Sequence, residues 1–348
     1  MVTTRGDRIL IDGNETALWG IRVASASQNE EATEHLLAQL NDYQAHGINA
    51  LTVFYQGSNG GCADPFSADG TEIDPAHQAR MERIIRACDE RGIVVIVGIF
   101  YQVKPVGGVM PEVHLRDWAA SLEAVCTVAR ELREFDNIIL NIANEQNSRG
   151  HQDHPWAPVR TAEGIIAGCA AVHEVDADRL VGGGGYDHAL NVVIGRSPEV
   201  DLLLFDTLGP NRQQHAGYWA DHFVAEGVTG KPLVSVEMFG NWTGGFKPPG
   251  VYPEVAQIAH FREIDDALAR PNLSVFFHSN NWCQGDYADY GNRYDLGGDG
   301  TAARPGIRWY FDYLQARRAG APSQTEDYVP AVERRAPKPL AEGEVDPG

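Results

Sequence analysis

Two short segments of the chain each end an apolar run in a glutamate. Residues 141–145 read Asn-Ile-Ala-Asn-Glu and end at Glu145, and residues 232–237 read Pro-Leu-Val-Ser-Val-Glu and end at Glu237. Two carboxyl groups that face each other across a glycosidic bond can hydrolyse it, because one protonates the leaving oxygen while the other attacks or stabilises the anomeric carbon. Strand ends would hold such groups rigidly. These residues therefore favour sugar chemistry.

The elements that must position these glutamates alternate along the chain between apolar runs and stretches of helical periodicity. We expect strands over 18–24, 50–55, 93–101, 138–143, 180–183, 202–205, 233–237 and 274–279. We expect helices over 31–46, 75–91, 115–134, 161–174, 218–227, 252–269 and 307–318, with a weaker one across 188–196.

Strands that are apolar throughout, each followed by a helix, indicate a parallel sheet covered on its outer face. Eight such repeats predict an α/β protein with a closed (β/α)8 TIM barrel. The structural alternative is a doubly wound open sheet, which would need a glycine-rich nucleotide turn after the first strand. Residues 19–25 read Trp-Gly-Ile-Arg-Val-Ala-Ser and contain no such turn.

The two ends of the chain lie outside this repeat. Residues 8–19 form two short β-type runs around Asp12 and Gly13, a dipeptide typical of hairpin turns, so we expect a short N-terminal β-hairpin that plugs the bottom of the barrel. Residues 1–318 are predicted to form a single catalytic barrel that includes this hairpin. Residues 319–348, rich in Pro, Glu, Arg and Ala, are predicted to be a strap along the barrel or a disordered tail.

Charge and composition limit the classes of molecule that the chain can bind. The chain has 348 residues and a formal net charge of −20, which argues against a nucleic-acid partner, because a phosphate backbone needs a basic face. A neutral oligosaccharide or polysaccharide suits this balance better. No apolar run approaches the ~18 residues of a membrane span, and the N-terminus lacks the apolar core of a secretory signal. We therefore expect a soluble chain with no membrane partner, cytoplasmic or secreted after removal of a signal.

Metal chemistry has weak support in the sequence. The five cysteines are scattered and form neither a disulfide framework nor a zinc signature. His151 and His154 are three positions apart in a loop that contains proline, which is a poor ligand pattern. We predict no metal and no cofactor.

Asn144 and Glu145 after the fourth expected strand, together with Glu237 at the end of the seventh, resemble clan A glycoside hydrolases, in particular the family 5 group of cellulases and mannanases. The resemblance covers roughly residues 6–318. It implies that Glu145 is the acid/base, that Glu237 is the nucleophile and that Asn144 binds the sugar 2-hydroxyl. The implied reaction is hydrolysis with retention by double displacement, without a cofactor.

Further substrate-binding candidates follow from their positions near strand ends. Trp282 follows the eighth strand, where members of the clan commonly place an aromatic floor under the sugar, and Trp156 and Trp242 lie in loops after the fourth and seventh strands. The remaining candidates are polar strand-end residues: Arg22, Tyr55, Tyr101 and His278.

The chain also departs from the family pattern. Gln146 stands where a proline usually follows the Asn-Glu pair, and Asp206 stands near the place of a His or Tyr after the sixth strand. The sugar, the choice between endo and exo action and the family within the clan therefore stay open, as does the oligomeric state. Two other functions remain alternatives: a barrel lyase or isomerase, which would want a strand-end lysine or a His/Asp/Glu cluster, and a non-catalytic carbohydrate-binding barrel.

Overall fold

Eight parallel strands close into a barrel in the computed structural model, which describes residues 1–57, 64–103, 110–207, 215–239, 248, 250–279 and 294–325. Neighbours in the barrel follow chain order, and the last strand pairs with the first. The predicted (β/α)8 fold is confirmed. The barrel strands are β4 (Trp19–Arg22), β5 (Ala50–Phe54), β6 (Val94–Phe100), β7 (Ile138–Ala143), β8 (Val181–Gly183), β9 (Leu202–Asp206), β10 (Leu233–Glu237) and β11 (Leu273–Phe277).

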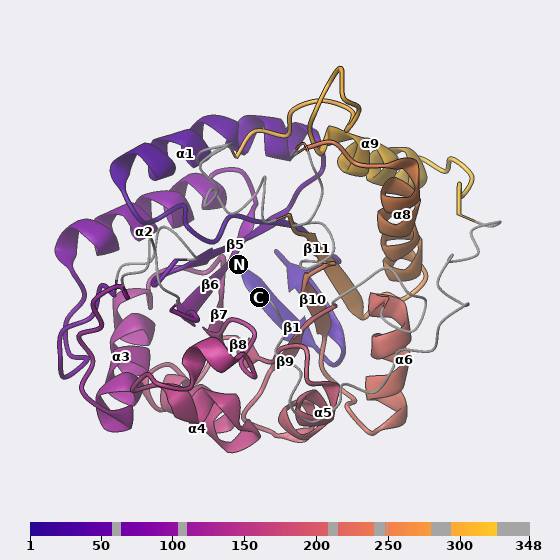
Figure 1. Ribbon diagram of the computed structural model, residues 1–348. Helices are drawn as coiled ribbons and strands as arrows, with labels where there is room; N and C mark the ends of the chain where they lie inside the picture. The colour runs from indigo at the N-terminus through magenta and orange to yellow at the C-terminus, as the bar shows by residue number, and fades with distance from the viewer. Residues whose placement is uncertain are drawn as a thin grey trace.

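The helices form a ring outside the strands (Figure 1). Their starts carry local signals. Asn29 caps α1 by accepting from the backbone N–H of Ala32 at 2.8 Å, and Asp74 caps α2 just before Pro75, which suits the first turn of a helix. None of the described helices is long and apolar enough to cross a membrane. The helices are α1 (Glu30–Ala45), α2 (Pro75–Asp89), α3 (Trp118–Glu131), α4 (Ala162–Val175), α5 (His188–Arg196), α6 (Ala216–Ala225), α8 (Glu254–Leu268) and α9 (Arg308–Arg318), with short 3₁₀ turns η1 (Arg149–His151) and η2 (Ala157–Arg160).

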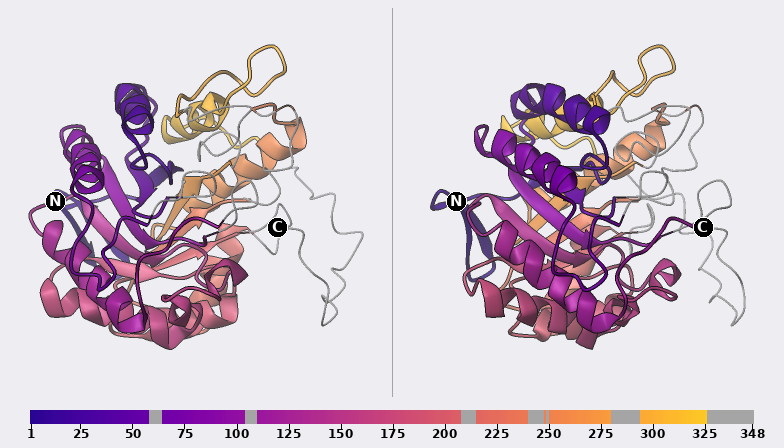
Figure 2. Two further views of the ribbon diagram at one scale, coloured as in Figure 1. Left: turned by 60° about the vertical axis from the view of Figure 1, so that its left-hand side comes forward. Right: turned by 90° about the vertical axis from the view of Figure 1, so that its left-hand side faces the viewer.

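The predicted N-terminal hairpin is confirmed. Strands β1 (Val2–Arg5), β2 (Arg8–Ile11) and β3 (Asn14–Glu15) form a small antiparallel sheet at one end of the barrel (Figure 2). The N–H of Val2 donates to the carbonyl of Asp136, just before β7 begins. Val2 and Ile9 also belong to the apolar cluster inside the barrel. The hairpin therefore closes the end where the strands start. After α9, the hydroxyls of Ser323 and Thr325 donate to Asp265 on α8.

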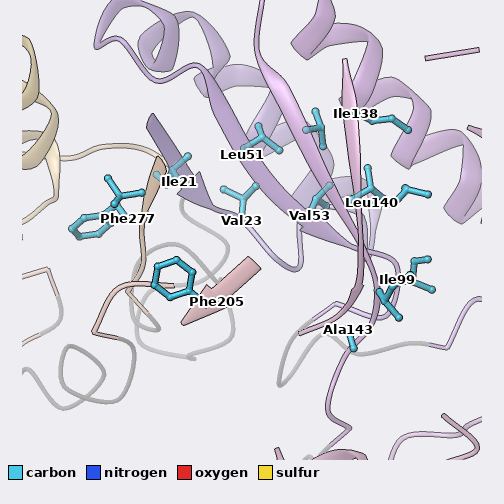
Figure 3. Packing of buried hydrophobic residues seen from close by; sticks show 14 of the residues in the cluster. Ile21, Val23, Leu51, Val53, Ile99, Ile138, Leu140, Ala143, Phe205 and Phe277 are labelled. Carbon is cyan, nitrogen blue, oxygen red and sulfur yellow. The ribbon is translucent and has the colours of Figure 1, made fainter. Parts of the chain in front are cut away.

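Apolar side chains pack on both faces of the strands. The larger cluster lies between strands and helices, and Figure 3 shows part of it, including Leu51, Leu140 and Phe277. The inner cluster fills the lumen with alternate residues, such as Leu202 and Leu204 on β9. With the lower lumen filled in this way, polar groups gather where the strands end.

Glycines let large groups approach the strands closely. A Cβ on Gly98 would lie 2.0 Å from the ring of Phe54, which therefore packs inside the barrel across β6. The glycine run after residue 181 also allows a close approach, because a Cβ on Gly182 or Gly184 would lie 2.2 or 1.8 Å from a carbonyl oxygen of β9. Gly184 has a positive φ of 154°, which side-chain-bearing residues rarely adopt.

Candidate active site

Arg22 is the hub of a polar cluster at the carboxyl ends of the strands. Its side chain is completely buried, and its guanidinium lies over the rings of Phe54 and Tyr101. Nη1 lies 2.8 Å from Oε2 of Glu237, while Nη2 donates to the hydroxyl of Tyr101 and to Oδ1 of Asn144, both at 2.7 Å. A planar guanidinium suits several acceptors at once. Arg22 therefore joins β10 to β7 through the lumen.

The path continues from Asn144 to Glu145. Nδ2 of Asn144 donates to Oε1 of Gln102 at 2.9 Å, and Nε2 of Gln102 donates to Oε2 of Glu145. Asn144 and Gln102 are 1% and 4% exposed, so water competes little with these bonds. The sequence did not single out Gln102. The only signal was a glutamine two positions after the end of β6.

The backbone at Glu145 is held in an uncommon conformation. Its φ is +38°, in the left-handed region that residues other than glycine rarely adopt. The turn is fixed from both sides, because the N–H of Ser148 donates to the carbonyl of Glu145 at 2.7 Å and the N–H of Gln146 donates to that of Gly184 at 3.3 Å. Outliers of this kind persist where the surroundings hold them, often at functional sites.

A local irregularity also precedes Glu237. The register of β9 and β10 shifts between Ser235 and Glu237, and such bulges often redirect a side chain beside an active site. Here Oε2 of Glu237 faces Arg22, and Oε1 lies 3.3 Å from Nε2 of His278, which follows β11. The Glu237 side chain is 7% exposed. Both of its oxygens are thus held by buried, nitrogen-bearing side chains.

Asp206, at the end of β9, is a third carboxyl group in this layer. It is the register partner of Glu237 and is 1% exposed. Within the described part of the chain neither of its oxygens has a hydrogen-bond partner. Burial, and then the charges of Glu237 and Glu145, raise the pKa of Asp206 well above the usual range, against the opposing effect of Arg22. No sequence pattern indicates this environment, and Asp206 stands out in the sequence only as a departure from the family pattern.

The structure brings six of the predicted residues together: Glu145, Glu237, Asn144, Arg22, Tyr101 and His278. The prediction that Tyr55 lines the site is wrong, because this fully buried side chain donates to Gln78 of α2 and lies on the helix side of β5. Trp156 is also fully buried. Its ring stacks on Phe100, and its Nε1 donates to His151, so it supports the loop from within. Trp242 and Trp282 lie outside the described residues.

A cavity of about 660 Å³ lies beside the Glu145 turn. Asn147 forms part of its wall and accepts from the N–H groups of Tyr186 and Asp187, which follow β8. The ring of Trp219, on α6, lies 3.7 Å from that of His188 between centroids. Aromatic rings with polar groups around them suit a sugar, which has an apolar face and a hydroxyl rim.

Potential metal ligands occur together once among the described residues. His215, Glu263 and Asp266 offer ligand atoms within 4.8 Å of one another. The Glu263 carboxyl, however, accepts from the N–H of Ala216 at 2.8 Å and so caps α6. This explains its buried position without a metal. His151 belongs to the histidine pair that is a poor ligand pattern in the sequence. Its Nε2 is hydrogen-bonded to the carbonyl of Asn144, and its Nδ1 accepts from Trp156.

Solved structures of glycoside hydrolases share this fold. The endo-1,4-beta-mannanase of Rhizomucor miehei matches with a TM-score of 0.59 and 14% identity, over 80% of this chain and 89% of its own. The beta-1,4-D-mannanase of Cryptopygus antarcticus matches with 0.59 and 14%, over 93% and 96%. A family 5 glycoside hydrolase from Bacteroides vulgatus matches with 0.60 and 14%, over 84% and 66%.

In sequence, no family model and no curated protein match the chain. At such low identities the structural likeness establishes the fold. The predicted resemblance to family 5-like members of clan A is confirmed at that level.

Proposed function

We propose that the protein is a glycoside hydrolase that cleaves β-linked neutral glucans, mannans or related oligosaccharides with retention of configuration. One observation carries this proposal. Glu145 and Glu237, which follow β7 and end β10, are joined by one continuous polar path through Arg22, Asn144 and Gln102. Hydrolysis by two carboxyl groups needs them fixed relative to each other. The buried path supplies that rigidity.

In the first step Glu145 donates a proton to the glycosidic oxygen while Glu237 attacks the anomeric carbon, so the bond to the leaving sugar breaks and an ester to Glu237 forms. Gln102 donates to Oε2 of Glu145, and this hydrogen bond orients the carboxyl group that gives up the proton. In the second step Glu145 takes a proton from water, and the water oxygen displaces Glu237 from the sugar. Arg22 favours the ionised form of Glu237 that both steps require.

Two of the structural neighbours are named as mannanases, which supports β-mannan as the first polymer to test. The wall of the cavity includes Asn147, two residues after the proposed acid Glu145, which favours this cavity for the sugars on the leaving side of the bond. Its rings, those of Trp219 and Tyr218, would stack on pyranose faces.

Two other functions fit the site less well. A Schiff-base lyase would need a lysine at a strand end. The one lysine among the described residues is Lys231, which precedes β10 at the opposite end of the barrel and donates to the carbonyls of Ser197 and Val200. A carbohydrate-binding barrel without catalysis would not need both Glu145 and Glu237.

The decisive experiment is covalent trapping. A 2,4-dinitrophenyl 2-deoxy-2-fluoro-β-mannoside, or the matching glucoside, should form the ester faster than it breaks down, so the intact mass should rise by one fluorosugar. Peptide mapping should place the label on Glu237. A label on Glu145 would exchange the two roles, and no label with either sugar, together with no hydrolysis of β-mannan or β-glucan, would overturn the proposed function.

A variant provides the control. Glu237→Gly should abolish hydrolysis and leave space for azide, which would convert an activated β-glycoside to the α-glycosyl azide. Unimpaired hydrolysis by Glu237→Gly would refute the nucleophile assignment.

A further inference from the structure

Asp206 has no part in the reaction proposed above, yet the charges of Glu237, Glu145 and Arg22 all act on it. It lies beside Glu237 on the adjacent strand, it is 1% exposed, and both of its oxygens lack hydrogen-bond partners among the described residues. Asp64, another buried aspartate, has a hydrogen-bond donor. Asp64, at 5% exposure, accepts from the N–H of His114 at 2.9 Å. A buried polar group left without a partner calls for an explanation.

The positions of the donors determine which carboxyl group can be negative. The ends of the Arg22 guanidinium are directed at Glu237, Tyr101 and Asn144. No ion pair joins Arg22 to Asp206 within the described residues. Two adjacent buried carboxyl groups resist being ionised together, and the one with a cation and donors keeps its charge more easily. The proton therefore belongs on Asp206.

The charge balance of the reaction agrees. With Asp206 neutral, the resting site holds the cation of Arg22, the anion of Glu237 and a protonated Glu145. After the first step Glu237 is a neutral ester and Glu145 is the anion. One cation faces one anion in both states. An ionised Asp206 would leave an uncompensated negative charge in the site throughout, which burial disfavours.

We infer that Asp206 is a positioning residue that holds a proton in the active enzyme and thereby leaves the buried guanidinium of Arg22 to Glu237. The inference builds on the proposed function. The groups that act on Asp206 are Arg22 on β4, Glu145 after β7 and Glu237 on β10. Behind them, Tyr101 after β6 contacts Arg22, and His278 after β11 contacts Glu237.

This role predicts a distinct response to alkaline pH. When Asp206 loses its proton, it competes with Glu237 for Arg22 and disturbs the alignment of the nucleophile, and small misplacements cost large factors in rate. The test measures labelling of Glu237 by the dinitrophenyl 2-fluoro glycosides in Glu145→Gln enzyme, because that leaving group needs no acid. Labelling should slow at least about tenfold from neutral to alkaline pH. In Glu145→Gln/Asp206→Asn the labelling rates at neutral and alkaline pH should be nearly equal, so their ratio should approach one.

The matched control is Asp64→Asn in the same Glu145→Gln background, which should keep the alkaline fall. The inference would be overturned if labelling still slowed at alkaline pH in the variant without Asp206. It would also be overturned if labelling did not slow in the enzyme that retains Asp206.

A second measurement does not depend on activity. The infrared difference spectrum of wild type minus Asp206→Asn at neutral pH should contain the C=O band of a protonated carboxylic acid. A carboxylate band for Asp206 would overturn the inference. If neither glycoside labels Glu237 in any variant and the wild type hydrolyses neither β-mannan nor β-glucan, the proposed function fails, and the infrared result still decides where the proton lies.

Discussion

The β6–β7 side and the β9 side of the barrel mouth are similarly buried but differ in their hydrogen bonds. After β6 and β7, Gln102 and Asn144 form an unbroken path to Glu145. At the end of β9, the side-chain oxygens of Asp206 have no hydrogen-bond partner among the described residues. A satisfied network fixes side-chain positions, whereas an unpartnered carboxyl group influences its neighbours mainly through its charge state. The β6–β7 side therefore fixes the positions of the side chains, and the β9 side affects the site through the charge state of Asp206.

Removing Arg22 should have the largest effect, because this residue joins the two sides. Arg22→Met leaves Glu237 buried without its cation, so we expect the free energy of unfolding to fall by about 3 to 5 kcal/mol and kcat/KM by about 10²- to 10³-fold. Urea unfolding and steady-state kinetics measure the two losses. Arg22→Lys should recover only part of each, because an ammonium group cannot serve Glu237, Tyr101 and Asn144 together. Full recovery in Arg22→Lys would contradict the bridging role.

Gln102 tests the hydrogen-bonded side alone. Gln102→Leu should lower kcat/KM on mannan or glucan by about 10- to 100-fold, because the proposed acid loses the donor that orients it. The loss should be much smaller on a dinitrophenyl glycoside, whose leaving group needs no proton. Gln78→Leu is the matched control, since Gln78 is a buried glutamine on α2 that accepts from Tyr55 outside the site. Equal losses on both substrates would show that Gln102 does not act through the acid.

The order and type of the elements could be predicted from the sequence, because apolar runs and helical periodicity repeat eight times. The presence of Glu145 and Glu237 at the same end of the barrel followed from its closure. The position of Tyr55 on the helix side of β5 also follows from the pattern of its strand. Leu51 and Val53 face the helices, so strand alternation places Tyr55 on their side and Phe54 in the lumen.

Other features depend on tertiary contacts that no local pattern contains. Gln102 gains its importance from where Asn144 and Glu145 lie. Asp206 reads as an ordinary strand-end aspartate until the described residues show that neither of its side-chain oxygens has a hydrogen-bond partner. Sequence patterns indicate which residue types lie at the mouth of the barrel, but they do not indicate which hydrogen bonds those residues make.

The smallest expected effect concerns the free energy of unfolding, which should respond differently to substitutions on the β9 side and on the β6–β7 side. The folded protein holds the Asp206 proton to a higher pH than the unfolded chain, which releases it near the ordinary aspartate pKa of about 3.9. Between these two pKa values the folded state binds more protons, so this group lowers the free energy of unfolding as pH rises. Asn cannot titrate. The stability of Asp206→Asn relative to wild type should therefore increase from about pH 4 toward neutral pH.

Urea unfolding of both proteins at several pH values measures this difference, and the other titrating groups cancel in it. Gln102→Leu should instead be less stable than wild type by an amount that hardly changes with pH, because it removes neutral hydrogen bonds. A constant difference for Asp206→Asn would mean that Asp206 does not hold its proton. A difference that falls with rising pH would mean that Asp206 is stabilised as an anion, and both sides of the barrel mouth would then act through charge-assisted contacts.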